Sequence, residues 1–402
     1  MRFRISTIAL AVAATLPSLA SAVDFSYSGF STAAYAQSDT DEAQVGYSGQ
    51  PNGIDSDGTF GIDSKLGVQV TAKFNEMVSA TVQGVAYADL TGDWEPHLDW
   101  AYVRVAPISS LSFRAGYLRA PTFMYSDSVF IGYANVWIRP PLEVYNMSPV
   151  YQMRGVDATW RTTVGPVNVS INPYIGDGEA DLPNDKLDVP HWSGIAATAE
   201  YRSLLFRVGY SELELGSTAT ALAPLLEGLR AIPGAFCGAC SSEADKLDLK
   251  DTIVKTSNVG VQYDDGANLI AAEWAYSDTN DNYLVPNKAG AYVTYGRRIS
   301  NVMPYATIAT SRRHTPTQSN AVLIPALAAG INATMASGYD DQNSYSLGVR
   351  YEVPSFSVLK GALVKLQFDH IDAEHGNGML NNATAGFDGS VNMVSASFDF
   401  IF

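Results

Sequence analysis

The sequence predicts an all-β protein, a transmembrane antiparallel up-and-down β-barrel of about 16 strands with short turns at one end and long loops at the other. Three observations lead to this prediction. Of the 402 residues 47% are hydrophobic but only 16% are charged, apolar residues alternate with polar ones, and short connections alternate with long ones. A soluble domain carries about a quarter charged residues, and a helical membrane protein shows apolar stretches of about 20 residues.

The charge of the chain is strongly acidic, with a formal net charge of −16 at pH 7. Nucleic-acid binding needs basic patches that neutralise phosphates. The sequence therefore argues against a nucleic-acid partner.

Residues 1–22 have the pattern of a secretory signal peptide. Arg2 and Arg4 precede the apolar stretch 5–16, and Ala20-Ser21-Ala22 forms a small-residue cleavage site. The alternative, a membrane anchor, needs a longer apolar stretch. We expect cleavage after Ala22 and a barrel formed by residues 23–402.

Alternation with a period of two runs through the mature chain. In the segment 65–74 the apolar residues Leu66, Val68 and Val70 are separated by polar ones or glycine, and the segment 345–351 has tyrosine at both ends. Residues at this spacing lie on opposite faces of a strand, and aromatic rings at the ends of the apolar face suit the two membrane interfaces. A soluble β-sandwich also alternates, but it gives no reason for aromatic ends or for connections that alternate in length.

The pattern divides the mature chain into sixteen strands. We place them at residues 25–36, 60–74, 77–88, 98–106, 111–120, 151–163, 167–175, 192–202, 204–214, 252–263, 267–276, 290–299, 303–313, 342–353, 358–371 and 390–402. Barrels of 16–18 strands leave a water-filled channel, and a plugged transporter of about 22 strands would need a longer chain. An open pore is therefore expected.

The mature start VDFSYSGFSTAAYA, the final strand VNMVSASFDFIF and the alternation of short turns and long loops resemble the Gram-negative porin family. The resemblance implies a general-diffusion channel in the outer membrane, a homotrimer, and lipid and lipopolysaccharide as surroundings. It also implies that the terminal Phe402 is the signal by which the barrel-assembly machinery inserts the chain. In porins the third long loop folds into the lumen, and here that loop is residues 121–150.

The third long loop is rich in aromatic residues and proline and poor in charge. Its charged residues are Asp127, Arg139 and Glu143, and its aromatic residues include Tyr133 and Trp137. A long aromatic loop is expected to pack on other parts of the protein. We expect it to line the pore constriction, and the alternative is a loop packed at the trimer junction or over the mouth.

Four arginines, Arg104, Arg114, Arg207 and Arg350, lie on the polar side of their strands. We expect Arg104 and Arg114 to face Asp127 and Glu143 across the pore, since opposed charges set up a transverse field that favours small polar solutes. The alternative is that these arginines are simply solvated in the lumen.

The predicted long loops hold far more acidic than basic residues. Such loops concentrate cations and could bridge to lipopolysaccharide through loosely bound Ca²⁺ or Mg²⁺. We expect no other cofactor and no dedicated metal site, and the sign of the ion selectivity stays open.

Cys237 and Cys240 lie in the fifth long loop. In an oxidising compartment a local disulfide is expected, whereas zinc would require further ligands that are not evident. The acidic and histidine-containing run 369–375 is expected to be a solvated loop.

The sequence therefore predicts a porin for passive diffusion of small hydrophilic solutes and ions, and not an enzyme. The first alternative is a channel selective for sugars or organic acids, with Tyr133, Trp137, Arg139 and Tyr145 as a binding track. The second is an outer-membrane barrel hydrolase, for which the chain shows no G-x-S-x-G motif.

Overall fold

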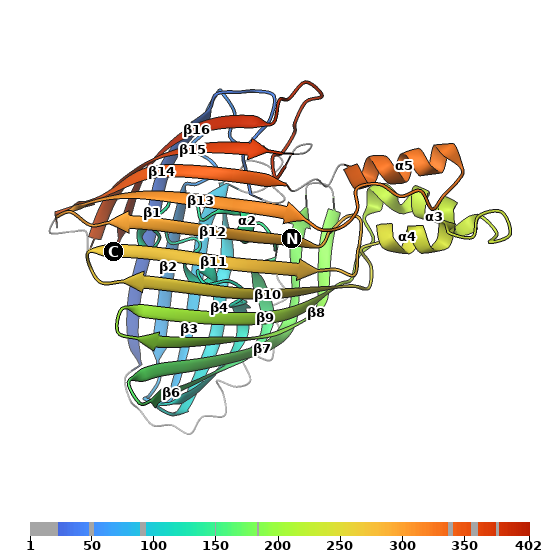
Figure 1. The fold of residues 1–402 in the computed structure, drawn as a ribbon. Helices are drawn as coiled ribbons and strands as arrows, with labels where there is room; N and C mark the ends of the chain where they lie inside the picture. Colours follow the sequence, from blue (N-terminus) through green and yellow to red (C-terminus); the bar gives the residue numbers. More distant parts are fainter. Residues whose placement is uncertain are drawn as a thin grey trace.

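Each strand of the protein pairs with its neighbours in sequence, and the first strand pairs with the last, so that sixteen antiparallel strands close into a barrel (Figure 1). This confirms the predicted fold class and strand number. The computed structural model describes residues 23–47, 52–88, 94–148, 150–182, 185–336, 341–354, 361–374 and 378–402. The predicted signal peptide, residues 1–22, lies outside the described residues.

The strands have the following bounds: β1 Asp24–Ser38, β2 Lys65–Lys73, β3 Val78–Ala88, β4 Trp94–Ile108, β5 Leu111–Arg119, β6 Gln152–Val164, β7 Val167–Leu182, β8 Asp185–Tyr201, β9 Leu204–Leu215, β10 Thr252–Asp264, β11 Asn268–Asp278, β12 Lys288–Arg297, β13 Val302–Arg313, β14 Gln342–Val353, β15 Gly361–Ala373 and β16 Ser390–Ile401. The α-helices are α2 Leu142–Tyr145, α3 Ala223–Ala231, α4 Cys240–Leu247 and α5 Pro325–Ala336.

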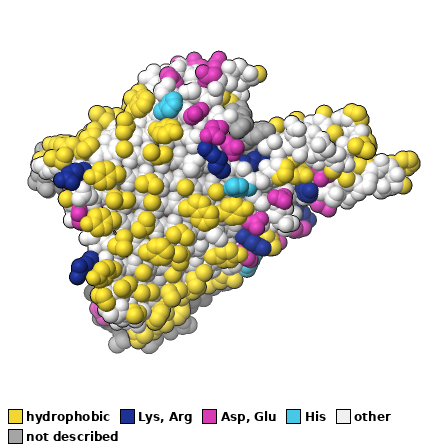
Figure 2. Space-filling model, in the orientation of Figure 1, with side chains coloured by type: hydrophobic (Ala, Val, Ile, Leu, Met, Phe, Trp, Pro, Cys, Tyr) yellow, Lys and Arg dark blue, Asp and Glu magenta, His cyan; other side chains and the backbone are white. Residues whose placement is uncertain are grey.

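The two faces of the barrel wall differ sharply in exposure. Outward residues such as Ile308 and Leu347 are 61% and 62% exposed, whereas inward Thr307 and Lys365 are 3% and 0% exposed. Hydrophobic side chains cover most of the visible outer wall, with few charges among them (Figure 2). The period-two pattern therefore separates an apolar outer surface from a polar inner one.

The chain end completes the closure of the barrel. The backbone N–H of Phe402 donates to the Gly29 carbonyl and the N–H of Gly29 donates to the Phe402 carbonyl, both at 3.0 Å. The Phe402 ring covers Gly29, where a Cβ atom would lie only 2.2 Å from the ring. Glycine is thus required at position 29 for the last aromatic ring to lie over the seam between β1 and β16.

Four predicted strand boundaries were wrong by four residues or more. β7 ends at Leu182 and β8 begins at Asp185. Most of the predicted long loop 176–191 is therefore a hairpin that extends the sheet. β2 begins at Lys65 rather than residue 60, and β4 begins at Trp94 rather than residue 98. In β4, β7 and β8 the backbone ladder continues past the apolar alternation, because strand pairing at the rim needs no membrane-facing side chains.

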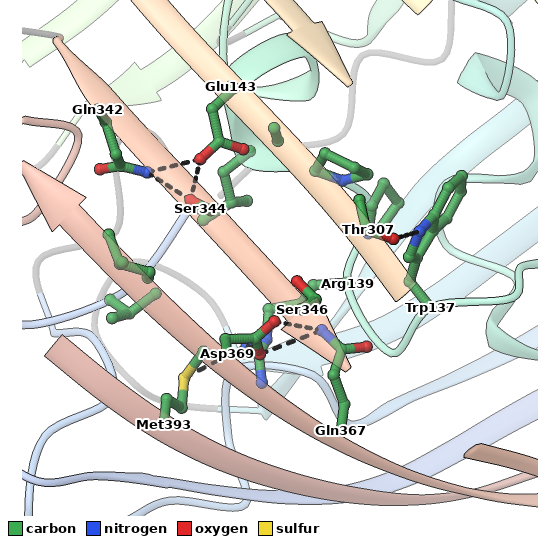
Figure 3. Close-up of a pocket in the computed structure, with 16 residues that line it drawn as sticks. Trp137, Arg139, Glu143, Thr307, Gln342, Ser344, Ser346, Gln367, Asp369 and Met393 are labelled. Atoms are coloured by element: carbon green, nitrogen blue, oxygen red, sulfur yellow. Dashed lines mark hydrogen bonds and ion pairs between the residues drawn. The ribbon is translucent and has the colours of Figure 1, made fainter. Parts of the chain in front are cut away.

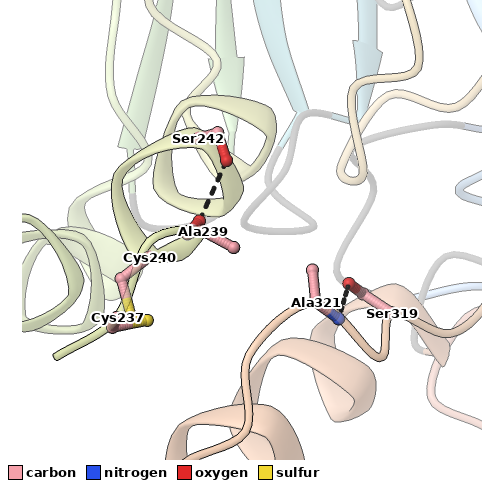
Figure 4. The surroundings of a disulfide bond; sticks show 6 residues. All are labelled: Cys237, Ala239, Cys240, Ser242, Ser319 and Ala321. Atoms are coloured by element: carbon pink, nitrogen blue, oxygen red, sulfur yellow. Dashed lines mark hydrogen bonds between the residues drawn. A yellow bond between two sulfur atoms is a disulfide. The ribbon is translucent and has the colours of Figure 1, made fainter. Parts of the chain in front are cut away.

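Helices α3, α4 and α5 form a cap that projects from the long-loop end beside β8 to β13 (Figure 1). Apolar side chains from the three helices and neighbouring loops form its core: Leu226, Leu229, Cys240, Ala244, Leu247, Tyr283, Val322, Ile331 and Met335. Cys237 and Cys240 form a disulfide at the start of α4 (Figure 4). No helix in the described part of the chain is long and apolar enough to cross a membrane.

Candidate functional site: the lumen loop

The segment 121–148, which we call the lumen loop, lies inside the barrel. It connects β5 to β6, and its helix α2 lies within the ring of strands (Figure 1). Its first residues contact β9, β10 and β11. Arg207 of β9 donates a hydrogen bond to the Pro121 carbonyl, and Asn258 of β10 donates to the Thr122 carbonyl at 2.6 Å.

The loop then crosses the lumen. The Tyr125 hydroxyl donates to the Gln262 side chain of β10 at 2.5 Å, whereas the Phe130 ring lies 5.5 Å from the ring of Tyr87 on β3. β10 and β3 are seven strands apart in a ring of sixteen, so they lie on nearly opposite sides of the barrel. Residues 126–130 therefore bridge the lumen.

Phe130 contacts aromatic rings and cationic side chains on the far wall. We call Arg119, Lys65, Tyr87 and Tyr151 the Phe130 cage. The Arg119 guanidinium carbon lies 4.2 Å from the ring centre and the Lys65 Nζ atom lies 5.3 Å from it. Tyr87 and Tyr151 contribute neighbouring rings at 5.5 and 6.2 Å. Arg119 itself forms an ion pair with buried Asp99. Cations over aromatic faces are attracted by the ring quadrupole, so this contact fixes the tip of the crossing segment.

After Phe130 the loop returns along the wall formed by β11 to β16. Lys365 of β15 is completely buried and donates to the carbonyls of Gly132 and Trp137 at 2.6 and 2.7 Å. The Trp137 indole N–H donates at 2.9 Å to Thr294 and Thr307 on β12 and β13. A lysine ammonium buried in this way keeps its hydrogen bonds only while the loop stays in place.

Arg139 ties the loop to three other segments, and Figure 3 shows it beside Asp369, one of its partners. Its Nε atom lies 2.7 Å from the Asp63 carboxylate, its Nη1 atom lies 3.6 Å from Asp369 on β15, and it donates a hydrogen bond to Ser395 on β16. All the charged partners are almost fully buried. Removing one member of such a buried group leaves an unpaired charge, which costs several kcal/mol.

Glu143 on α2 accepts hydrogen bonds from Gln342 at 2.8 Å and from Ser344, both on β14 (Figure 3). Burial raises the pKa of the Glu143 carboxyl above its usual value, although these two hydrogen bonds act in the opposite direction. A cavity of about 40 Å³ separates this part of the loop from the wall. That volume holds only a few water molecules, so the loop lies close to the wall here.

The predicted lining role was wrong for three residues of the loop. Trp137, Arg139 and Glu143 are 1%, 5% and 2% exposed, and Tyr145 of the alternative binding track is 2% exposed. Each of them faces the wall because its polar atoms find partners there, as the Tyr145 hydroxyl does with Glu273 at 2.8 Å. They anchor the loop and do not touch the open part of the lumen.

Polar side chains with exposure to the lumen lie on the crossing segment and on β4 and β5. Asp127, in the short 3₁₀ helix Ser126–Ser128, is exposed and interacts electrostatically with Arg114 of β5. Arg104 of β4 lies directly opposite Arg114 in the strand pairing. Asp127 thus lies near Arg114, which is the neighbour of Arg104 in the strand pairing, whereas Glu143 binds β14 and not these arginines. Arg114 instead forms a two-pronged ion pair with Asp157 of β6.

Two further predicted arginines hold the loop. Arg207 binds Pro121, and the Arg350 Nη1 atom lies 3.5 Å from the Asn135 carbonyl. The Arg350 guanidinium also lies over the Tyr133 ring at 5.6 Å. Both side chains keep partial exposure toward the lumen.

The loop anchors that sequence reasoning missed are Asp63, Lys65, Phe130, Lys365 and Asp369. The expectation that Asp369 lies in a solvated loop was wrong, because Asp369 is on β15 and buried. Lys365 and Asp369 are on the polar side of β15, which marks them as inward residues. Nothing in the sequence pairs them with a loop more than 200 positions away. In the described part of the chain, no group of three or more His, Cys, Asp or Glu residues is placed to hold a metal ion.

Comparison with solved structures matches this architecture to outer-membrane channels. OmpF of Salmonella typhi, solved in complex with daunomycin, aligns at a TM-score of 0.56 and 12% identity over 94% of this chain and 97% of that one. The outer-membrane channel DcaP of Acinetobacter baumannii aligns at 0.56 and 11% identity over 96% and 99%. The trimer form of OmpT, an outer membrane protein of Vibrio cholerae, aligns at 0.55 and 15% identity over 95% and 100%.

The chain has a porin-like fold. No protein-family model and no curated protein sequence matches the chain. The likeness is therefore one of backbone architecture, and the roles of the loop anchors are argued from the residues of this chain alone.

Proposed function

We propose that this porin-like barrel forms a water-filled outer-membrane channel for passive diffusion of small hydrophilic solutes and ions. The observation that carries the proposal is the division of the lumen. The lumen loop packs against β11 to β16, while Asp127, Arg104 and Arg114 keep exposure between the crossing segment and the opposite wall. A barrel of sixteen strands is too wide for its own side chains to fill, so this sector is open to water.

The proposed location is the outer membrane of a Gram-negative bacterium, with lipid and lipopolysaccharide around the barrel. The apolar outer wall and the paired seam between β1 and β16 support it, since closure satisfies every strand edge in lipid. The short turns and both termini would face the periplasm, and Phe402 would be read by the barrel-assembly machinery. Acidic residues of the long loops would then face outward, where they could bind Ca²⁺ or Mg²⁺ loosely.

The proposed selectivity of the channel depends on charges facing one another across the open sector. Asp127 projects from the crossing segment, and Arg104 and Arg114 project from the wall. Opposed charges order water and polar solutes across the constriction and disfavour apolar ones. We expect a narrow, weakly ion-selective pore.

Purified protein inserted into planar bilayers tests the proposal. We expect discrete conductance steps in KCl, and reversal potentials in a KCl gradient give the sign of the selectivity. Lipid vesicles containing the same protein test the rival hydrolase function through release of fatty acids. Membranes without conductance steps, together with fatty-acid release, would replace the channel by the enzyme.

A further inference from the structure

Strand β4 presents an unusual row of side chains to the lumen. Trp100, Tyr102 and Arg104 are spaced two residues apart, and each is partly exposed. Their partners on β3 are Gln83, Thr81 and Ser79, and the first two are inward residues that are almost fully buried. Since side chains two apart share a face of a strand, all three residues of β4 point into the lumen.

Charge in this row is not balanced within the protein. Arg104 lies directly opposite Arg114 on β5, and like charges directly opposite in a sheet repel each other. Asp157 neutralises Arg114, with oxygens 3.0 and 3.1 Å from the Arg114 Nε atom. In the part of the chain that the structure describes, Arg104 makes no hydrogen bond or ion pair. One guanidinium group therefore stays available to an anion in the lumen.

The same row provides aromatic surfaces beside that guanidinium group. The ring centres of Trp100 and Tyr102 are 6.1 Å apart, and the Arg114 guanidinium carbon lies 5.3 Å from the Tyr102 ring centre. The cation over Tyr102 holds that ring in place, so the aromatic surface is preorganised. Arginine binds carboxylates through paired hydrogen bonds, and aromatic side chains stack on flat rings.

We propose that Trp100, Tyr102 and Arg104 form a solute-binding track for carboxylic acids that carry an aromatic ring. The carboxylate of the solute pairs with Arg104, and its ring stacks on Trp100 or Tyr102. Asp127 faces the track from the crossing segment and limits the affinity, so that the solute is released again. This inference rests on the proposed channel and names the class of solute that the channel selects.

Block of single-channel conductance by three probes tests the track. Benzoate carries both features, acetate carries only the carboxylate, and benzyl alcohol carries only the ring. We expect benzoate to reduce the KCl conductance in a saturable way, at concentrations at least about tenfold below those needed for the other two, which corresponds to 1.4 kcal/mol. Equal block by benzoate and acetate would overturn the aromatic part of the proposal.

Variants assign the block to these residues. Arg104→Gln should raise the half-blocking concentration of benzoate about tenfold. Trp100→Ala should raise the half-blocking concentration of benzoate but not that of acetate, whereas Trp100→Phe keeps an aromatic ring and should keep the block by benzoate. Asp127→Asn should lower the half-blocking concentration of benzoate. Arg161→Gln is the matched control, because Arg161 is an exposed arginine of β6 on the same inward face as Asp157 but near the short-turn end.

The outcomes separate the track from the channel. KCl conductance without block contradicts the track and leaves the channel standing, whereas no KCl conductance contradicts both. An effect of Arg161→Gln as large as that of Arg104→Gln would mean that only the total charge of the lumen matters, and it would overturn the site.

Discussion

At the scale of single residues, Phe130 decides where the lumen loop ends its crossing. Its ring contacts Arg119, Lys65 and Tyr87, and no hydrogen bond of its side chain can replace these contacts. We expect Phe130→Ala to destabilise the protein by about 1–3 kcal/mol and to give a larger, noisier single-channel conductance, because the crossing segment loses its far attachment. Phe236→Ala is the control, since that ring is 83% exposed on the cap. An unchanged conductance in Phe130→Ala would show that the loop keeps its position without the cage.

The inward direction of single residues was predictable, but their partners were not. Arg104 and Arg114 were assigned to the lumen from the side of the strand on which they lie, and the structure places them there. Asp127 and Glu143 looked alike in the sequence, since both are acids in a loop without periodicity. Only the fold shows that Glu143 meets Gln342 and is buried, while Asp127 meets the open lumen. Such pairings join positions about 200 residues apart, and local sequence carries no record of them.

At the scale of elements, strands were predictable wherever one face meets the apolar surroundings. β2 shows unbroken alternation, and β14 does so from Ser344 to Tyr351, because the outward residues there must be apolar. The rim parts of β7 and β8 are acidic and show no such pattern, yet backbone pairing extends the hairpin. The cap helices are stabilised by contacts between three loops, which is a tertiary property.

The disulfide acts on the cap alone. Cys240 is fully buried in the cap core, and the bond to Cys237 closes a segment of only four residues. The double variant Cys237→Ser, Cys240→Ser should lose about 2 kcal/mol of local stability, since loop-closure entropy grows only slowly with length. We expect faster trypsin cleavage near Arg230 and Lys246 and an unchanged thermal unfolding of the barrel by circular dichroism. A lowered unfolding temperature of the barrel would show instead that the cap and the wall unfold together.

At the scale of the whole molecule, the mean hydropathy of zero follows from the barrel. Apolar outward residues and polar inward residues alternate along much of the barrel wall, so their contributions cancel in an average. For the same reason strand number and closure followed from alternation and connection length. The path of the lumen loop depends on buried ion pairs such as that of Arg139 with Asp63, and neither composition nor mean hydropathy indicates such a pair.

The outer surface of the whole molecule is uneven, and we propose that this unevenness marks the interface of the homotrimer that the resemblance to porins implies. Outward residues of β3 include the small Ala80, Gly84 and Ala86, whereas β11 to β14 present Trp274, Tyr295, Ile308, Tyr345 and Leu347. A flat surface of small residues lets subunits approach closely, while large side chains suit lipid.

Val82→Trp on β3 should therefore break the trimer, because the ring has no room between subunits. Val293→Trp on β12 should leave it intact, since the two valines are 51% and 55% exposed and only their side of the barrel differs. Light scattering on the detergent-solubilised variants measures the mass of the assembly. Equal masses for the two variants would contradict an interface at β3, and a wild-type mass of one subunit would contradict the trimer itself.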